Sequence, residues 1–399
     1  MNDLRADWHF ESQAILSWWM RHMEDTEHGG FYGYRDGKGK LRAQADKGII
    51  MHSRILWTLA EAGLHFKEEV YLEAAQRAYH YLLTHFVDQE YGGVYWMLTY
   101  RGEVLSDKKQ VYAQAFSLYA LSSYYILTKE ESSLEMALGI FDLLERHSLD
   151  PEHGGYLEAF SREWNLLADV RLSEKDQNEA KTMNTHLHLL EAYAALFKAL
   201  SISNSYYEEK ADVRQALSNL IHLFQSRFIN EDGNLYLFFD EYWNLKSQVI
   251  SFGHDIEAAW LLWEAAEYLQ EGELSRNLKP DVLNMIAATH QKGFAEDGSL
   301  WNEQHANGSI DKQRHWWPQV EAMVGCYLGY QLTGEEAYLQ RVKGLWRFIQ
   351  KYQIDPVGGE WHWLVDENLK PDLSIYKAGP WKAPYHNVRA LLELLRRTA

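Results

Sequence analysis

Length, composition and charge narrow the classes of protein to which this chain can belong. Of its 399 residues, 46% are hydrophobic and 14% are aromatic, so the chain can bury a large core and lacks the composition of a disordered protein. The formal net charge of -18 disfavours nucleic acids and anionic membranes as partners, because both would repel it. We therefore expect a neutral small-molecule substrate.

Cysteine usage and hydropathy bear on the cellular compartment. The single cysteine, Cys326, excludes an internal disulfide and a cysteine-based zinc site. The first residues include acids and no uninterrupted apolar core, and no stretch approaches the roughly 20 apolar residues of a membrane span. These features predict a cytoplasmic protein.

A short signature recurs along the whole chain: an acidic residue, then Gly-Gly or Asp-Gly, then an aromatic residue within a few positions. The second glycine or its equivalent marks six copies, and such glycines suit tight turns with positive φ beside a short β-hairpin. Successive markers lie 61 to 65 residues apart, except for one interval of 78 that contains the polar segment 161–181, which we predict to be a loop insertion. The markers are Gly30, Gly93, Gly155, Gly233, Gly298 and Gly359.

Each repeat also contains two segments with apolar residues at helical spacing, such as 55–66 and 71–86 in the first repeat. Twelve helices in six pairs can close into an inner and an outer ring, which predicts an all-α (α/α)6 barrel with short β-hairpins at one end. An open solenoid is the alternative, but neither end of the chain shows the polar capping repeat that a solenoid needs. No Pro/Gly/Ser-rich linker interrupts the repeats, so we expect one domain over residues 1–399.

The first helix after each marker is mostly apolar but begins with polar residues, as expected of an inner ring. Helices at equivalent positions of a closed ring run parallel, so their starts converge on one mouth of the barrel. In chain order the six starts carry Arg54; Tyr112 and Gln114; Asn184, His186 and His188; His254, Asp255 and Glu257; Trp316, Trp317, Gln319 and Glu321; and His386, Asn387 and Arg389.

Histidines are the most informative of these residues. A lone histidine in an apolar helix is more often a hydrogen-bonded core residue, but three at equivalent positions of three repeats favour a site. His186 and His188 are about 200° apart around a helix, so at most one of them faces inward and a metal at this pair is not expected. His254 and Glu257 share a helix face, so Glu257 can orient His254 or contact substrate.

Four of these runs carry a family resemblance. MNTHLHLLEAY, SFGHDIEAAWLL, HWWPQVEA and WKAPYHNVRALLE resemble the corresponding segments of cellobiose 2-epimerases, in the N-acylglucosamine 2-epimerase superfamily. The resemblance spans nearly the whole chain and implies an (α/α)6 barrel. It implies that His254 and His386 are the paired general acid/base residues, that His188 assists ring opening, that Arg54 and Asn184 hold the reacting end of the sugar, that Glu257 and Glu321 are pocket carboxylates, and that Trp317 and Trp381 pack against sugar rings.

The expected reaction interconverts glucose and mannose at the reducing end of β-1,4-linked disaccharides such as cellobiose and lactose. The proton on carbon 2 becomes acidic only when carbon 1 is an aldehyde, so the ring must open first. A neutral histidine can take and return that proton near pH 7. Two histidines can act on opposite faces of the cis-enediolate, or one can suffice if the intermediate rotates about C2–C3. The chemistry requires no cofactor or metal.

Several alternatives stay open from the sequence. Within the superfamily these are mannose 2-epimerase, mannose isomerase and N-acylglucosamine 2-epimerase. Outside it, (α/α)6 barrels include glycoside hydrolases that use two carboxylates, for which Asp255, Glu257 and Glu321 are candidates. A non-catalytic sugar-binding protein is the third class. We expect a monomer or a weak homo-oligomer.

Overall fold

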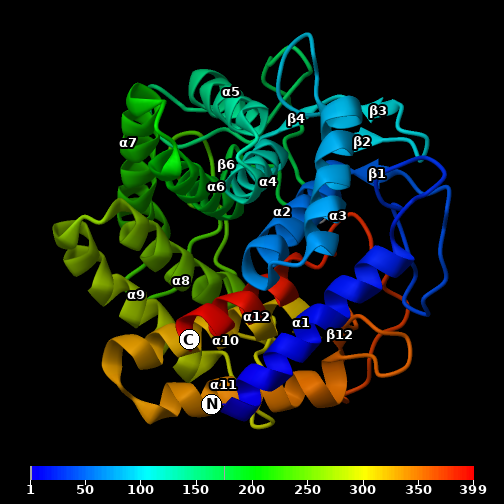
Figure 1. Cartoon of the computed structure of the whole chain (residues 1–399). Helices are drawn as coiled ribbons and strands as arrows, with labels where there is room; N and C mark the ends of the chain where they lie inside the picture. Colours follow the sequence, from blue (N-terminus) through cyan, green and yellow to red (C-terminus); the bar gives the residue numbers. More distant parts are fainter. Residues whose placement is uncertain (1, 175) are drawn as a thin grey trace.

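The structure is a computed structural model that describes residues 2–174 and 176–399. Twelve α-helices lie within these residues (Figure 1). They are α1 (Asn2–His22), α2 (Ile49–Phe66), α3 (Glu69–Tyr81), α4 (Val111–Thr128), α5 (Glu131–His147), α6 (Met183–Ile202), α7 (Tyr207–Leu223), α8 (Phe252–Leu269), α9 (Gly272–Lys292), α10 (Trp316–Thr333), α11 (Glu336–Phe348) and α12 (Tyr385–Arg397). One π-helical turn extends each of α3, α7 and α11: η1 (Leu82–Phe86), η2 (Phe224–Phe228) and η3 (Ile349–Gln353).

The even-numbered helices form a closed inner ring. Each of them packs against the next, and α12 returns to α2. The helices α3, α5, α7, α9 and α11 each pack outside the inner helix that precedes them, whereas α1 packs on α12. The sixth pair therefore joins the first and last helices of the chain, which lie side by side in Figure 1. The predicted (α/α)6 barrel is confirmed, and the open solenoid is wrong.

Apolar patterning separates the two rings. Inner helices such as α4 are buried from their first residue through four turns, because other helices cover both their inner and outer faces. Outer helices such as α5 bury only a stripe of residues and expose the opposite face. No helix in the described part of the chain is both long and apolar enough to cross a membrane.

The six glycine markers lie in tight turns, as predicted. All have positive φ, from 62° at Gly30 to 86° at Gly298. An antiparallel bridge closes each turn, as Leu149 with Tyr156 closes the one around Gly155. A Cβ at Gly155 would lie 2.5 Å from the Trp243 ring, so space as well as φ requires glycine there.

Short strands join neighbouring repeats at the mouth of the barrel. The two residues before an inner helix pair antiparallel with a strand that follows the next marker, and a single bridge between Arg35 and Ala378 makes the sixth junction. The hairpins predicted within repeats are thus also connections between repeats. The pairs are β1 (Lys47–Gly48) with β2 (Met97–Leu98), β4 (Lys109–Gln110) with β5 (Ala159–Phe160), β6 (Lys181–Thr182) with β7 (Phe238–Phe239), β8 (Ile250–Ser251) with β9 (Glu303–Gln304), and β11 (Arg314–His315) with β12 (Leu364–Val365); β3 (Val104–Ser106) adds to β2 and β10 (Ile310–Asp311) adds to β9.

Candidate active site

A cavity of about 810 Å³ opens where the N-terminal ends of the inner helices converge. The predicted loop insertion, 161–181, contributes Leu172 and Asp176 to its wall, and the segment before α12 contributes Tyr376 and Trp381. Of the nine predicted site residues, Glu321 lies behind His386 rather than at the cavity surface. The other eight line the cavity: Arg54, Asn184, His188, His254, Glu257, Trp317, Trp381 and His386.

Polar side chains near the starts of the inner helices bind the marker loops. Nδ1 of His186 donates to the carbonyl of Thr182, and its Nε2 accepts the backbone N–H of Tyr156 at 2.8 Å. His52, Gln114, Asp255 and Gln319 accept a backbone N–H from the marker loops of their own repeats in the same way. His186 is therefore a structural residue, and of the pair considered from the sequence it is His188 that faces the site.

These loop-binding residues also fix the register of the inner helices. His254 comes one residue before Asp255, and His386 comes one residue before Asn387, which binds Glu360 of the last marker loop. His188 instead comes two residues after His186. The expectation that the three site histidines are equivalent is wrong, since His188 lies almost one turn deeper. In that deeper layer it is joined by Arg54, Glu257, Glu321 and Arg389, each two residues after the loop-binding side chain of its repeat.

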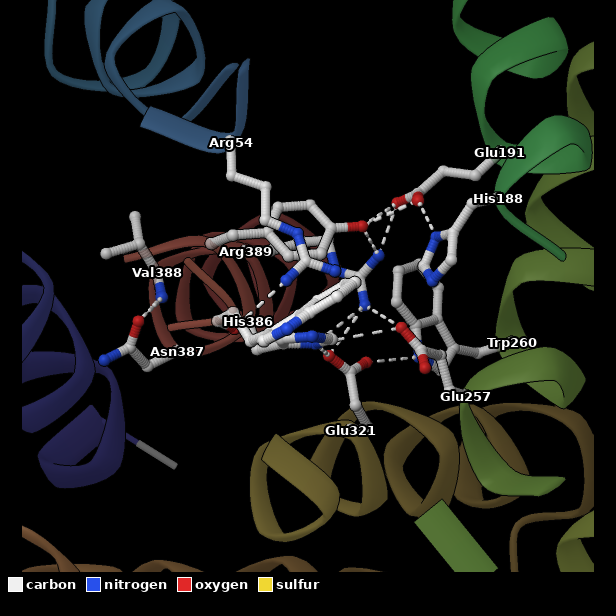
Figure 2. Close-up of polar contacts among 12 residues, drawn as sticks. Arg54, His188, Glu191, Glu257, Trp260, Glu321, His386, Asn387, Val388 and Arg389 are labelled. Atoms are coloured by element: carbon white, nitrogen blue, oxygen red, sulfur yellow. Dashed lines mark hydrogen bonds and ion pairs between the residues drawn. The ribbon is translucent and has the colours of Figure 1, made fainter. Parts of the chain in front are cut away.

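His386 is held by a buried carboxylate. Its Nδ1 donates to Oε1 of Glu321 at 2.7 Å, and Nε1 of Trp260 donates to the other oxygen of Glu321 at 3.0 Å (Figure 2). Burial lowers the pKa of His386 well below its usual value, and burial also raises the pKa of Glu321. His386 is therefore neutral near pH 7, and because Nδ1 carries the proton, Nε2 is the nitrogen available to a ligand.

His254 and His386 both pack against Trp317. The ring centroids of His254 and Trp317 are 4.7 Å apart, and those of Trp317 and His386 are 5.5 Å apart. Nδ1 of His254 makes a hydrogen bond of 2.7 Å with the hydroxyl of Ser251, and burial lowers the pKa of His254 to about 4. Glu257 does not orient His254, contrary to one expectation, because its carboxylate instead accepts from Arg389.

Arg389 is the centre of a buried ionic network at the floor of the cavity. Its guanidinium donates to Glu191, to Glu257 and, at 2.6 Å, to Glu321 (Figure 2). Glu257, Glu321 and His386 offer ligand atoms within 4.8 Å of one another, the spacing of a metal site. The guanidinium of Arg389 already bonds to both carboxylates and balances their negative charge. A metal ion would have to displace that guanidinium, so these residues do not fit a metal.

Arg54 differs from Arg389 in its partners. Its Nη2 donates to the hydroxyl of Tyr112 at 2.8 Å and its Nη1 donates to the carbonyl of Trp381 at 3.3 Å. Both partners are neutral, whereas Arg389 bonds to three carboxylates. The charge of Arg54 therefore remains available to a negatively charged ligand atom at the cavity surface.

Sequence reasoning gave no role to three residues of this network. Arg389 was placed on the last inner helix without a function, and Glu191 and Tyr385 were not singled out. Tyr385 donates its hydroxyl to Glu191 at 2.6 Å. The sequence does contain a signal for Glu191 and Arg389. Each is a charged residue three positions after a histidine in an apolar inner helix, His188 and His386 respectively, and residues i and i+3 share a helix face.

A closed helical barrel whose mouth presents neutral histidines above a buried Arg–carboxylate network is suited to moving protons on a neutral ligand. Comparison with known proteins identifies the family. The family model of N-acylglucosamine 2-epimerase (GlcNAc 2-epimerase) matches residues 29–390. The chain belongs to this family and is an enzyme of the carbohydrate epimerase class.

Individual relatives match nearly end to end. The chain is 45% identical to the cellobiose 2-epimerase of Bacteroides fragilis, over 96% of this chain and 95% of that protein. It is 39% identical to the cellobiose 2-epimerase of Ruminococcus albus, over 96% of each. The solved structure of cellobiose 2-epimerase from Bacillus thermoamylovorans superposes with a TM-score of 0.93 at 37% identity, covering 100% of both chains.

Proposed function

We propose that this enzyme interconverts glucose and mannose at the reducing end of β-1,4-linked disaccharides such as cellobiose and lactose. The observation that carries the proposal is the pair His254 and His386, two histidines with lowered pKa that both contact Trp317 and line one cavity. The cavity, at about 810 Å³, lies in the upper part of the usual range for ligand pockets and has room for two sugar rings. The relatives named cellobiose 2-epimerase support this substrate class.

Ring opening is the first step. We assign it to His188, whose Nδ1 is bonded to Glu191 and whose other nitrogen is available to the cavity. Its neutral imidazole can take the proton of the hydroxyl on carbon 1 while the bond from carbon 1 to the ring oxygen breaks. Asn184 and Trp381 line the same part of the site and would hold the reacting sugar.

Proton transfer at carbon 2 follows. His254 and His386 are both neutral near pH 7, so either can remove the proton and become an imidazolium. After rotation about C2–C3 the same imidazolium can return the proton to the other face. In the two-base alternative the second histidine first takes a proton from water and gives it to the opposite face, and the first histidine then releases its proton to water. The enediolate places negative charge on the oxygen of carbon 1. Arg54 is the residue best suited to stabilise that charge, because its own hydrogen bonds go to neutral groups.

The carboxylates support a glycoside hydrolase less well. Such an enzyme needs one carboxyl group as acid and another as nucleophile or base. Glu257 and Glu321 both bond to Arg389, and Asp255 bonds to Asn234 and to the backbone of Leu235 in a marker loop. All three groups are committed to structural contacts, so we favour the epimerase.

The proposal also covers the domain organisation, the compartment and the oligomeric state. The whole span 1–399 would act as one catalytic domain, in agreement with the packing of α1 on α12. We propose that it works in the cytoplasm as a monomer or weak homo-oligomer.

Incubation with cellobiose, lactose, mannose and N-acetylmannosamine in deuterated water tests the proposal. We expect the two disaccharides to acquire deuterium at carbon 2 and to yield their 2-epimers without release of monosaccharide, as read by NMR. Exchange on the monosaccharides alone would move the substrate assignment to another branch of the family. Glucose release from cellobiose without exchange at carbon 2 would contradict the epimerase.

A further inference from the structure

Glu191 is fixed by groups from the opposite side of the barrel. It lies one turn after His188 on α6, and its Oε2 accepts from Nδ1 of that histidine at 2.9 Å. The hydroxyl of Tyr385 on α12 lies 2.6 Å from each of its oxygens, and Nη1 of Arg389 donates to Oε1. Its side chain is only 2% exposed. Both oxygens of the carboxylate are therefore held in place by α12.

We propose that Glu191, oriented by Tyr385, is the positioning residue that fixes the tautomer and ring orientation of His188 for sugar ring opening. This inference rests on the proposed function. An ionised carboxylate can only accept hydrogen bonds, so Nδ1 of His188 must carry the proton and Nε2 must carry the lone pair. Without Glu191 both tautomers become accessible, and the wrong tautomer presents an N–H where the base is needed.

The charges around the pair support this assignment. Burial alone would raise the pKa of Glu191, but the charge of Arg389 and the His188 hydrogen bond outweigh burial and hold it at about 2. Burial lowers the pKa of His188, and Glu191 opposes that effect. The titratable groups that surround His188 are Glu191 on its own helix, Arg54 from α2, Tyr112 from α4, Glu257 from α8, and Tyr385, His386 and Arg389 from α12.

The proton balance of the step follows from this geometry. Nε2 of His188 takes the proton of the O1 hydroxyl, the C1–O5 bond breaks, and the C1=O1 bond forms. A water molecule delivers a proton to O5 and receives the one held by His188. During the step the imidazolium faces the Glu191 carboxylate, which stabilises the transient charge.

The barrel floor thus contains two histidine–carboxylate pairs joined by one guanidinium. Glu191 holds His188, Glu321 holds His386, and Arg389 bonds to both carboxylates. If the first pair serves ring opening and the second serves carbon 2, their loss should have different consequences.

Glu191→Gln tests the assignment, with enzyme-catalysed mutarotation of cellobiose as the readout of ring opening and deuterium uptake at carbon 2 as the readout of the later step. We expect both rates to fall by about 10²-fold in Glu191→Gln, because exchange needs the open aldehyde. KM should change less than kcat, since Glu191 does not line the cavity.

His386→Ala should lose exchange but keep mutarotation. In Glu191→Gln, loss of the negative charge at position 191 lowers the pKa of His188 further, so the acid limb of the kcat/KM profile should move to lower pH.

Glu145→Gln is the matched control. Like Glu191, Glu145 accepts from tyrosine, in its case from the hydroxyls of Tyr156 and Tyr193 at 2.7 Å each, but it lies on outer helix α5. Its replacement should leave mutarotation and the pH profile unchanged.

Tyr385→Phe provides a second test should Glu191→Gln fail to fold. It keeps the carboxylate but removes its orienting hydroxyl, and should slow mutarotation by about tenfold; added to His188→Ala, it should cause no further loss. The inference would be overturned if Tyr385→Phe mutarotated cellobiose at the wild-type rate. It would also be overturned if the double variant lost mutarotation by the full product of the losses in Tyr385→Phe and His188→Ala. A wild-type enzyme that neither mutarotates nor exchanges carbon 2 would instead overturn the proposed function.

Discussion

His254 and His386 occupy the same position of their inner helices, each one residue before the side chain that binds a marker loop, and both rings contact Trp317. The two histidines therefore approach one cavity from adjoining walls of the barrel, α8 and α12 being separated only by α10. The loop contacts set the register of both helices, so the spacing of the pair depends on the repeat architecture.

Replacement of His254 or His386 by alanine should abolish turnover and spare binding. Each imidazole is proposed to move a proton, whereas the sugar would still contact Trp317, Trp381 and Arg54. We expect kcat for cellobiose epimerisation to fall by at least about 10²-fold and the Kd from calorimetry to change only a few-fold. His222→Ala, on the exposed face of α7, is the control and should behave as wild type. Sugar affinity lost in parallel with turnover would argue against a purely chemical role.

Replacement by glutamine should have different effects at His186 and at His188. Gln114 accepts the marker-loop N–H of its own repeat, so His186→Gln can make the same contact. We expect His186→Gln to keep activity within about twofold, whereas His188→Gln should lower kcat by about 10²-fold. Steady-state kinetics of the two variants provide the measurement, and equal losses would mean that the assignment of the two histidines is wrong.

The same His186→Gln variant should change how stability depends on pH. Burial lowers the pKa of His186 from 6.5 to about 4, so between these values the unfolded state binds more protons than the folded state. The stabilisation is present above pH 6.5 and is lost as the pH falls toward 4. Between pH 7 and 4.5 we expect the wild type to lose on the order of 2 kcal/mol more unfolding free energy than His186→Gln. Urea denaturation at both pH values measures this, and identical slopes with pH would contradict it.

Loss of Arg389 should destabilise the fold as well as the site. Arg389→Met would leave the carboxylates of Glu191, Glu257 and Glu321 buried without their cation. We expect the free energy of unfolding to fall by about 3–5 kcal/mol. Denaturant unfolding monitored by tryptophan fluorescence measures this change. Arg214→Met breaks an exposed ion pair with Glu271 and should cost less than about 1 kcal/mol. Similar losses in both variants would show that the network contributes little.

The repeat architecture could be predicted from the sequence because its signals are local. Glycine markers such as Gly30 and Gly155 depend on turn geometry, and the paired amphipathic segments depend on helical periodicity, so both are visible within short windows. Together with the number of repeats they indicated twelve helices around a closed ring. The same periodicity placed polar residues at the helix starts, and nine of the residues named there line the cavity.

Tertiary structure alone decided what those polar residues bind. His186 and His188 are alike in sequence, yet the first binds a loop and the second binds Glu191, because the register of α6 against its marker loop determines which side faces the cavity. Glu257 shares a helix face with His254 but bonds to Arg389, which lies 132 residues further along the chain. Contacts of that kind depend on ring closure between α12 and α2, which is a property of the whole chain and of no local segment.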